Sequence, residues 1–295
     1  MQKRYRAAAT ALLLTATAGM AATGGAAEAS GTHHDRAGAK TLTITIKSKA
    51  HSLKVSDTTF RPGNTIFRVK NIDGKDSNGL VQLIRLRKGY TLQDAFTDVP
   101  QALKGIPAAV KRVDGNIIFY GGMNAKGGRN KPAQKWAVNV NKPGAYYLVN
   151  LDSGNLAPLT VKGTKQHRAL PSRDGFINPV PSHNASGNTF EAGKHNAVSG
   201  WMSSKNKTAE PHFVDIEQVK KGTKNRDITK MFQGGPNVFL KHGAATDTGV
   251  ISPGHRFLWS YDLKQGRYGV LCFWPSIDDG MPHAMMGMHI VTHLG

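Results

Sequence analysis

Cys272 is the only cysteine in this chain of 295 residues, and it ends an apolar run that begins at Gly266. A single cysteine cannot close an intramolecular disulfide, so its presence needs another reason. Ten residues later comes Pro282-His283, in a loop that also carries four methionines. Thiolate, imidazole and thioether groups are the ligands that soft metals prefer. The segment therefore indicates a soft-metal site.

A second imidazole is available on a distant segment. His212 follows Pro211 and precedes the apolar stretch 213–219. Two imidazoles and one thiolate in a trigonal arrangement, with a weak axial thioether, suit copper that cycles between Cu(I) and Cu(II). Such a site takes one ligand from a distant strand and the others from one loop, a pattern that His212, Cys272 and His283 satisfy. Three methionines compete for the axial place: Met285, Met286 and Met288.

The elements that must position these residues are strands. Residues 41–47 and 136–141 alternate apolar with polar side chains, and glycine or proline turns follow at short intervals. Only a few segments, such as 91–102 and 227–231, have the composition of short helices. We therefore predict an all-β fold of sandwiches with Greek-key connections.

The two halves of the chain repeat one another, which predicts two tandem β-sandwich domains. Three blocks recur in the same order, although each alone would be a weak signal. The corresponding pairs are 59–63 with 189–193, 80–89 with 213–222, and 142–150 with 264–272. The predicted organisation is a signal peptide (1–29), a disordered leader (30–39), a first domain (40–163), a linker (164–186) and a second domain (187–295).

The halves differ where the candidate ligands lie. In the repeat's register, His212 corresponds to Gly79 and Cys272 to Asn150. A site built from these residues therefore belongs to the second domain alone. We expect the first domain, which has the framework without the ligands, to serve stability, partner docking or orientation.

The second domain resembles the cupredoxins, or blue copper proteins, in its Gly-x-Tyr-x-x-x-Cys strand followed by a loop with histidine and methionine. It is similar to exported bacterial cupredoxin-like proteins whose loop ends as Gly-x-Pro-His-x-x-x-Gly-Met, here residues 280–288. The resemblance covers about 187–294 with the ligand pattern and about 40–163 as framework. It implies a type 1 copper site with His212, Cys272 and His283 as equatorial ligands and Met288 as the axial ligand.

Two features depart from that family. The loop from Cys272 to His283 is longer than in its small electron carriers, and Phe213 stands where many members have an asparagine. Multicopper oxidases need His-x-His pairs, which this sequence lacks, and nitrite reductases place a histidine where Phe273 stands. We therefore expect no enzymatic activity. Closed zinc sites use more cysteine than one, and we expect surface or packing roles rather than metal binding for His242, His255, His289 and His293.

The first residues predict export. Three basic residues precede an apolar stretch at 7–22, and Ala27-Glu28-Ala29 is a cleavage pattern. No later stretch approaches the roughly 20 apolar residues of a membrane span. Cleavage would remove three basic residues and Glu28, which lowers the formal charge from +20 to +18. Such charge suits an anionic cell-wall polymer, a membrane surface or an acidic redox protein. The alternative, which we prefer, is a solvated surface, because the basic residues are scattered from Lys40 to Arg267 without a dense basic block. No nucleic-acid-binding motif is present.

These observations predict an exported, extracytoplasmic type 1 copper protein that transfers electrons to a redox partner. One alternative is a copper-scavenging or copper-delivery protein that works with a copper-exchange partner, since thioethers favour Cu(I) and His33-His34 offers an extra Cu(II) site. Another alternative is a metal-free extracellular binding module that keeps the sandwich without the chemistry.

Overall fold

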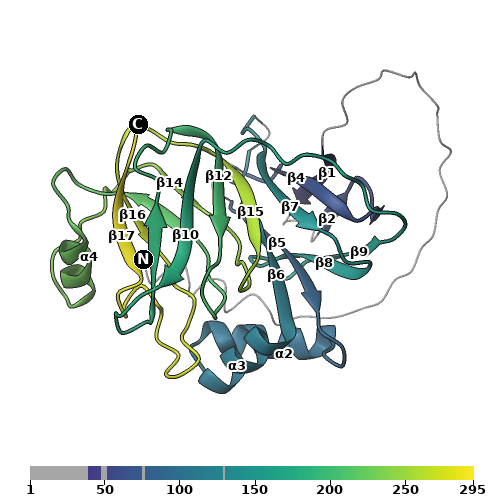
Figure 1. The fold of residues 1–295 in the computed structure, drawn as a ribbon, viewed down its shortest axis with the longest axis horizontal. Helices are drawn as coiled ribbons and strands as arrows, with labels where there is room; N and C mark the ends of the chain where they lie inside the picture. The colour runs from purple at the N-terminus through teal and green to yellow at the C-terminus, as the bar shows by residue number, and fades with distance from the viewer. Residues whose placement is uncertain (1–38, 48–51, 75–76, 129) are drawn as a thin grey trace.

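The structure, a computed structural model, describes residues 39–47, 52–74, 77–128 and 130–295. The predicted signal peptide at 1–29 and the pair His33-His34 lie outside the described residues. Strands dominate the described part, which confirms the all-β prediction (Figure 1). None of its helices is long and apolar enough to cross a membrane.

The described part of the first half contains nine strands and a pair of helices between the fifth and sixth strands. In order these are β1 (Lys40–Lys47), β2 (Ser52–Val55), β3 (Thr59–Phe60), β4 (Gly63–Asn71), β5 (Leu80–Leu86), α2 (Leu92–Leu103), α3 (Pro107–Asn116), β6 (Ile117–Asn124), β7 (Gln134–Val140), β8 (Gly144–Asn150) and β9 (Leu156–Val161).

The second half contains eight strands and one helix. In order these are β10 (Gly175–Pro181), β11 (Asn188–Ala192), β12 (Ser199–Lys205), β13 (Asp215–Gln218), α4 (Asn225–Phe232), β14 (Ala245–Asp247), β15 (Arg256–Asp262), β16 (Gly266–Leu271) and β17 (His289–Leu294).

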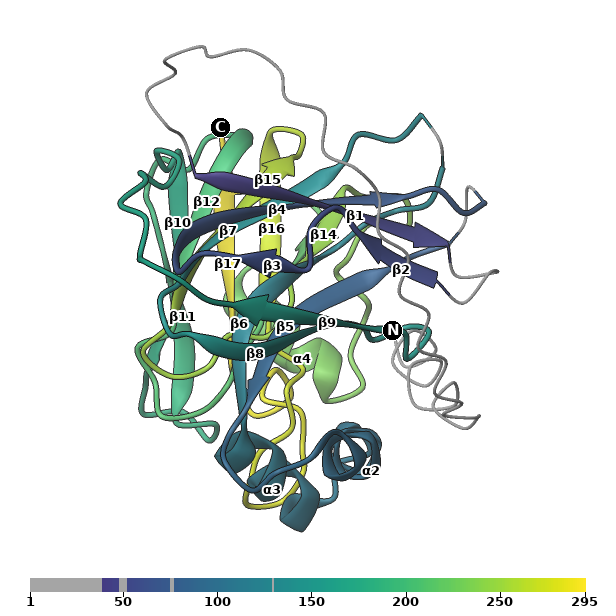
Figure 2. The same cartoon turned by 90° about the vertical axis from the view of Figure 1, so that its right-hand side faces the viewer.

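Three sheets pack together, and the largest of them runs through both halves. Its order is β11-β10-β12-β15-β7-β4-β1-β2, while β3-β9-β8-β5-β6 and β14-β13-β16-β17 form the two smaller sheets. Side chains in β1 and β4 alternate between buried and more exposed, as expected of strands with one face on a core. Figure 2 shows the strands of the first half as stacked layers, with α2 and α3 at one end of the molecule.

The strand registers reproduce the sequence repeat. In the first half Gln82 of β5 lies opposite Val149 of β8. In the second half the corresponding residues, Asp215 of β13 and Leu271 of β16, lie opposite each other. One more step along the same register brings Cys272 to the place that Asn150 occupies in the first half.

A tyrosine at the start of the repeated hairpin makes the same contact in both halves. The Tyr146 hydroxyl donates to the Lys142 carbonyl at 2.8 Å, and the Tyr268 hydroxyl donates to the Lys264 carbonyl at 2.7 Å. The repeat in the sequence is therefore a repeat of local structure.

The halves join edge to edge through equivalent strands. Antiparallel β7 and β15 place Ala137 opposite Leu258 and Trp136 opposite Trp259. In the register of the repeat, Ala137 corresponds to Trp259 and Trp136 to Leu258. Exchange of the two halves therefore converts one pair into the other, as in a two-fold symmetric interface.

The predicted linker needs a correction. Within residues 164–186 the strand β10 pairs with β11 from Ile177 to Pro181 and with β12 at Gly175 and Phe176. Pro179 and Pro181 lie inside this strand, and prolines of this kind are typical of loops and sheet edges rather than of paired strands. They obscured the strand in the sequence. The other domain boundaries stay predictions.

Two of the three described helices match predicted segments. Thr91 caps α2 in a capping box with Asp94, which fixes its start. Residues 227–231 lie within α4. Helix α3 was not predicted, because its ten residues include Gly115 and Asn116 and lack a side-chain cap; only Pro107 at its first turn is a start signal.

Candidate metal centre

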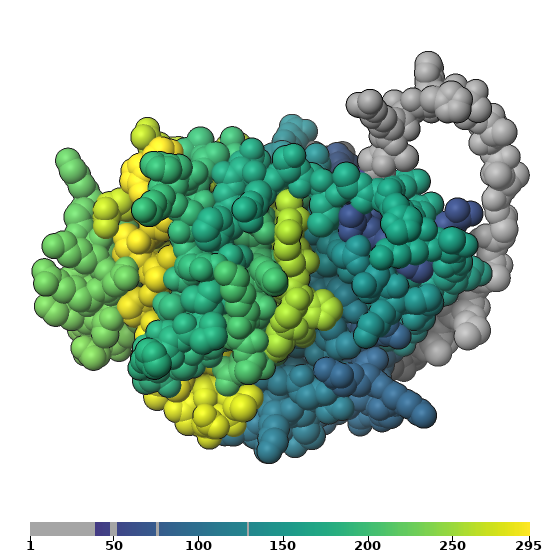
Figure 3. Space-filling view, in the orientation of Figure 1, coloured from purple at the N-terminus to yellow at the C-terminus, as the bar shows by residue number. Residues whose placement is uncertain are grey.

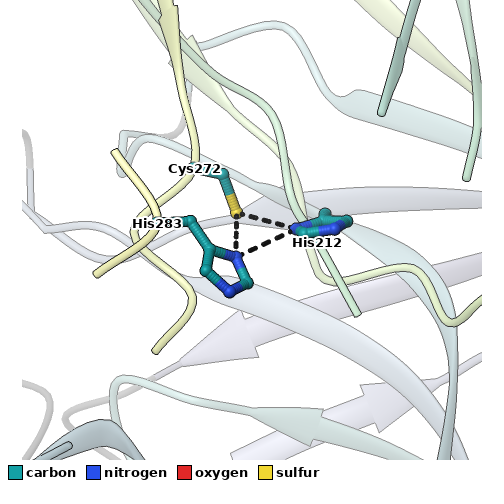
Figure 4. A group of neighbouring side chains, drawn as sticks. All are labelled: His212, Cys272 and His283. Carbon is teal, nitrogen blue, oxygen red and sulfur yellow. Dashed lines mark hydrogen bonds between the residues drawn. The ribbon is translucent and has the colours of Figure 1, made fainter. Parts of the chain in front are cut away.

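Three candidate ligands meet inside the second domain (Figure 4). The Cys272 Sγ atom lies 3.5 Å from His212 Nδ1 and 4.0 Å from His283 Nδ1, and the two Nδ1 atoms are 3.2 Å apart. All three side chains are buried. Among the residues that the structure describes, this is the group of histidine, cysteine and acidic side chains that could hold a metal ion.

The donor set fits a soft cation. Each pair of facing atoms among Cys272 Sγ, His212 Nδ1 and His283 Nδ1 can share at most one hydrogen-bonding proton. His212 Nε2 and His283 Nε2 are also buried without a hydrogen bond, although His283 Nε2 lies close to a carboxylate described below. A thiolate and two imidazoles are the equatorial donors of blue-copper sites. These residues would hold copper.

The sheet places Cys272. The residue follows directly after β16, whose last residue, Leu271, pairs with Asp215 of β13 and with His289 of β17. A strand flanked by two neighbours fixes the direction in which the next side chain points. Cys272 is fully buried for this reason.

His212 is held by a two-way backbone contact. Its amide donates to the Ile251 carbonyl at 3.2 Å, and the Ile251 amide donates to the His212 carbonyl at 2.7 Å. The segment that carries Ile251 is in turn bonded to the first domain. There the Gln82 side chain accepts from the Val250 amide at 2.6 Å and donates to the Val250 carbonyl at 3.1 Å. The first domain thus positions the segment to which His212 is anchored.

The loop that carries His283 folds back on the end of β16. The His283 amide donates to the Trp274 carbonyl at 3.0 Å, and the Ala284 amide donates to the Cys272 carbonyl at 2.6 Å. The Met288 amide then donates to the His283 carbonyl at 2.9 Å. The ten residues between Cys272 and His283 therefore form a loop that folds back and places His283 next to Cys272.

The methionines of this loop differ in exposure. Met288 is fully buried, whereas Met285 is 48% and Met281 is 42% exposed. Met286 is intermediate. Burial sets Met288 apart as the methionine that packs inside the domain, and its role as the axial ligand stays a prediction.

A carboxylate that the sequence did not single out faces the outer edge of His283. Glu210 Oε2 lies 2.9 Å from His283 Nε2 at an ion-pair distance. Burial on its own lowers the pKa of His283, but the Cys272 thiol and Glu210 outweigh it and raise the pKa to about 9. Burial and the charge of His283 lower the pKa of His212 well below its usual range. A metal ion would replace the proton that His283 holds.

The first domain covers this edge of the site. The Trp274 indole donates to Asp114 Oδ1 of α3 at 3.1 Å. Burial, with a smaller effect from the nearby Glu210 carboxylate, raises the pKa of Asp114 to about 7. Gly280 lies so close to Gly105 that a Cβ atom there would collide with the Gly105 carbonyl. Both figures of the fold show α3 beside this loop.

Sequence reasoning missed Glu210 and Asp114. Glu210 lies two residues before His212, which is a signal that could have drawn attention to it. Asp114 gave no signal, because its contact joins segments 160 residues apart.

Four other histidines that the structure describes are not part of the cluster. His289 Nε2 contacts the Thr229 hydroxyl at 3.2 Å, and the His255 ring packs edge-on against Tyr120. His242 and His293 are exposed.

No family model matches the sequence, and no curated protein matches it. Solved structures similar to it include auracyanin A, a "blue" copper protein from Chloroflexus aurantiacus, at 18% identity and a TM-score of 0.32, over 42% of this chain and 100% of that one. Others are a copper nitrite reductase from Nitrosomonas europaea (11% identity, TM-score 0.25, 88% of this chain and 94% of that one) and a multicopper oxidase from Pediococcus acidilactici (11%, 0.25, 89% and 60%).

One prediction is corrected by these comparisons. We expected no enzymatic activity, yet the solved structures similar to this chain include enzymes, among them copper nitrite reductases and multicopper oxidases. The prediction is therefore withdrawn.

The fold and the cluster agree with the resemblance seen in the sequence. Strands dominate both halves, and the thiolate and the two imidazoles converge in the second half. The described chain is mostly β-strand, and its second half brings together the thiolate and the two imidazoles that a type 1 copper site requires.

Proposed function

We propose that this protein is an exported electron carrier with a type 1 copper centre. The observation that carries the proposal is the convergence of Cys272 Sγ with the Nδ1 atoms of His212 and His283 in a buried pocket. Met288, fully buried in the same loop, is the axial ligand in this proposal.

In this proposal the metal and the protein chain contribute different parts of the chemistry. Copper supplies a one-electron couple when bound. The chain holds its donors on β16, on the anchored segment of His212 and on the folded-back loop, so that they keep their places in both oxidation states. Burial of all three donors excludes water from the metal.

A copper titration of the mature protein tests this function. One equivalent of Cu(II) is expected to produce an intense visible thiolate-to-copper band and an electron spin resonance signal with small copper hyperfine splitting. Cys272→Ser removes the band, because no other thiol exists in the chain. His293→Ala is the matched control, since this exposed histidine lies outside the cluster. A band that persists in Cys272→Ser would refute the assignment.

Copper delivery is a second candidate, favoured by the exposure of Met281 and Met285 beside the site. Exposed thioethers bind Cu(I) and could receive it before it reaches the buried donors. If delivery is the function, Met281→Leu with Met285→Leu slows Cu(I) uptake and leaves the reduction potential unchanged. An unchanged uptake rate would leave electron transfer as the remaining candidate.

The proposal also includes export of the protein and binding to a negatively charged partner. The pattern in residues 1–29 supports cleavage and release outside the cytoplasmic membrane. The formal charge of +18 that remains supports an acidic redox partner or an anionic wall or membrane surface. Mass spectrometry of the secreted protein, with Ser30 expected as its first residue, tests the cleavage.

A further inference from the structure

Residues 219–244, which connect β13 to β14 and contain α4, form a lobe that packs directly against the metal centre. We call this segment the basic lobe. It projects from the side of the molecule in Figure 1, where α4 is labelled, and it is the light-green surface at the left edge of Figure 3. Its buried residues Val219, Ile228 and Phe239 form one apolar cluster with Leu271 and Ala284.

The lobe touches the sequence neighbours of three candidate ligands. Leu271 precedes Cys272, Ala284 follows His283, and His289 follows Met288. The hydroxyl of Thr229 in α4 contacts His289 Nε2 at 3.2 Å, and the side chain of Asn225 accepts from the Val291 amide at 2.5 Å. The lobe is therefore held in a fixed place beside the centre.

An aromatic contact leads from the thiolate into the lobe. Phe273 is bonded directly to Cys272, and its ring meets that of Phe232 edge-on at a centroid distance of 6.1 Å. Phe232 is the last residue of α4 and is partly exposed. Electron tunnelling weakens steeply with distance and is faster through bonds than through gaps. Two residues and one ring contact thus separate the thiolate from the surface of the lobe.

The opposite route, through His283, is closed by other parts of the chain. His283 is 1% exposed. Its outer nitrogen faces Glu210. The first domain covers the same side of the loop through the hydrogen bond between Trp274 and Asp114 and through the close approach of Gly105 to Gly280. The Nε2 edge of His283 is thus covered, whereas the lobe offers an exposed surface that one ring contact joins to Phe273.

The lobe is also strongly basic. It carries six Lys or Arg residues and a single acidic residue, Asp227, so that 26 residues hold +5 of the formal charge of +20. The exposed apolar side chain of Leu240 lies in the same segment. The basic residues are all exposed: Lys220, Lys221, Lys224, Arg226, Lys230 and Lys241.

We propose that the basic lobe is the docking surface for an acidic electron-transfer protein, and that electrons pass between copper and partner through Phe273 and Phe232. This inference rests on the proposed electron-transfer function. Opposite charges steer a partner to the surface and raise the rate of encounter. The reaction moves one electron from Cu(I) to an oxidised partner, which gives Cu(II) and a reduced partner, with no proton transferred.

Two small oxidants of opposite charge test the docking surface on the full-length mature protein. The Cu(I) protein is mixed with excess hexacyanoferrate(III), an anion, or with tris(phenanthroline)cobalt(III), a cation, and the return of the visible band is followed. Neutralising Lys220, Lys221 and Lys224 to glutamine is expected to slow oxidation by the anion about tenfold at low ionic strength and not to slow oxidation by the cation.

The matched control removes the same charge from the first domain, at the exposed residues Lys54, Lys88 and Lys165. It is expected to change the rate with the anion by less than about twofold. Equal slowing in the lobe and control variants would overturn the docking surface, because net charge alone would then explain the effect.

Phe232→Leu tests the path. It is expected to slow oxidation by both probes while the visible band and the reduction potential stay unchanged. Unaltered rates in this variant would overturn the aromatic route. Absence of the visible band from the unmodified protein would instead mean that the proposed function itself has failed, so the two failures are distinguishable.

Discussion

Glu210 was not identified from the sequence, yet it contacts a candidate ligand of the metal centre. Its carboxylate lies 2.9 Å from the outer nitrogen of His283, which is the arrangement that orients an imidazole ligand and raises its basicity. We predict that Glu210→Gln lowers copper affinity about 10- to 100-fold and raises the reduction potential, since lost negative charge favours Cu(I).

Competition with a copper chelator and a redox titration measure both effects. Glu191→Gln is the control, because Glu191 pairs with Lys207 on the same domain. Equal affinity for the Glu210 and Glu191 variants would show that the Glu210 carboxylate has no role in the centre.

Met288 gives a second test at the same scale. It is fully buried, and Met285 in the same loop is 48% exposed. We predict that Met288→Leu shifts the visible spectrum and raises the reduction potential, because the axial thioether tunes a blue-copper site. Met285→Leu is expected to leave both unchanged. If the two variants behave in the opposite way, Met285 is the axial ligand.

The candidate equatorial ligands could be predicted from sequence because residue type and order carry that information. Cys272 is unique in the chain, His212 stands where the first half has Gly79, and His283 lies in the loop that follows Cys272. Asp114 could not be found in this way, because its contact joins segments distant in sequence. Glu210 lies close to His212 in the sequence, but its contact with His283 is a property of the folded chain. Burial separated Met288 from its neighbours, and burial is a property of the folded chain.

At the scale of elements, the helical hairpin of the first domain and the ligand loop of the second touch through two glycines. Gly280 has a φ of +74°, and a Cβ there would collide with Gly105. The positive φ alone costs an L-residue roughly 1–2 kcal/mol. Because the Cβ collision adds to this cost, we predict that Gly280→Ala lowers the free energy of unfolding by more than that amount.

Gly254→Ala is the matched variant, because Gly254 has the same φ of +74° with open space around its Cα. It isolates the backbone cost from the collision. Urea unfolding followed by fluorescence measures both variants. Equal losses would mean that the hairpin does not press on the ligand loop.

The element-level predictions succeeded where the signal was local. The capping box at Thr91 starts α2, and alternation of polar and apolar residues marks β1. Strand β10 was missed because its prolines suit a loop, whereas pairing with β11 and β12 determines its structure. Pairing partners are tertiary information that a local pattern does not contain.

At the scale of the whole molecule, Asp114 links the domains and should make stability depend on pH. Burial raises its pKa from 3.8 to about 7, so the folded state holds a proton that the unfolded state releases above pH 4. Stability from this group is therefore present at low pH and lost as pH rises toward 7, by up to about 1.4 kcal/mol per pH unit.

The difference in unfolding free energy between the unmodified protein and Asp114→Asn isolates this effect from other acids. Measured without copper by urea unfolding, that difference is expected to fall from pH 4 to 7 and to stay constant above pH 7. A difference independent of pH would show that Asp114 is ionised throughout that range.

The two domains share a continuous sheet, which the sequence repeat did not predict. The repeat predicted two sandwiches, but their equivalent strands β7 and β15 pair to make a continuous sheet. Exposed sheet edges invite such pairing. Gln82 of the first domain also bonds the segment that anchors His212. The first domain is therefore part of the support of the metal centre.

This continuity predicts that copper protects amides far from its site. At a free concentration one hundred times its Kd, a ligand of the folded state stabilises it by about 2.7 kcal/mol. If the shared sheet unfolds as one unit, hydrogen exchange of the slowest amides in β4 and β7 should slow about a hundredfold on copper binding, as in β15 and β16.

Exchange measured by mass spectrometry with and without copper checks the prediction, and Cys272→Ser supplies the control in which no slowing is expected in either domain. Slowing confined to β12–β17 would mean that the first domain opens independently. The β7 and β15 pairing would then be an interface between separately folding units, and the first domain would position His212 without sharing in the energy of copper binding.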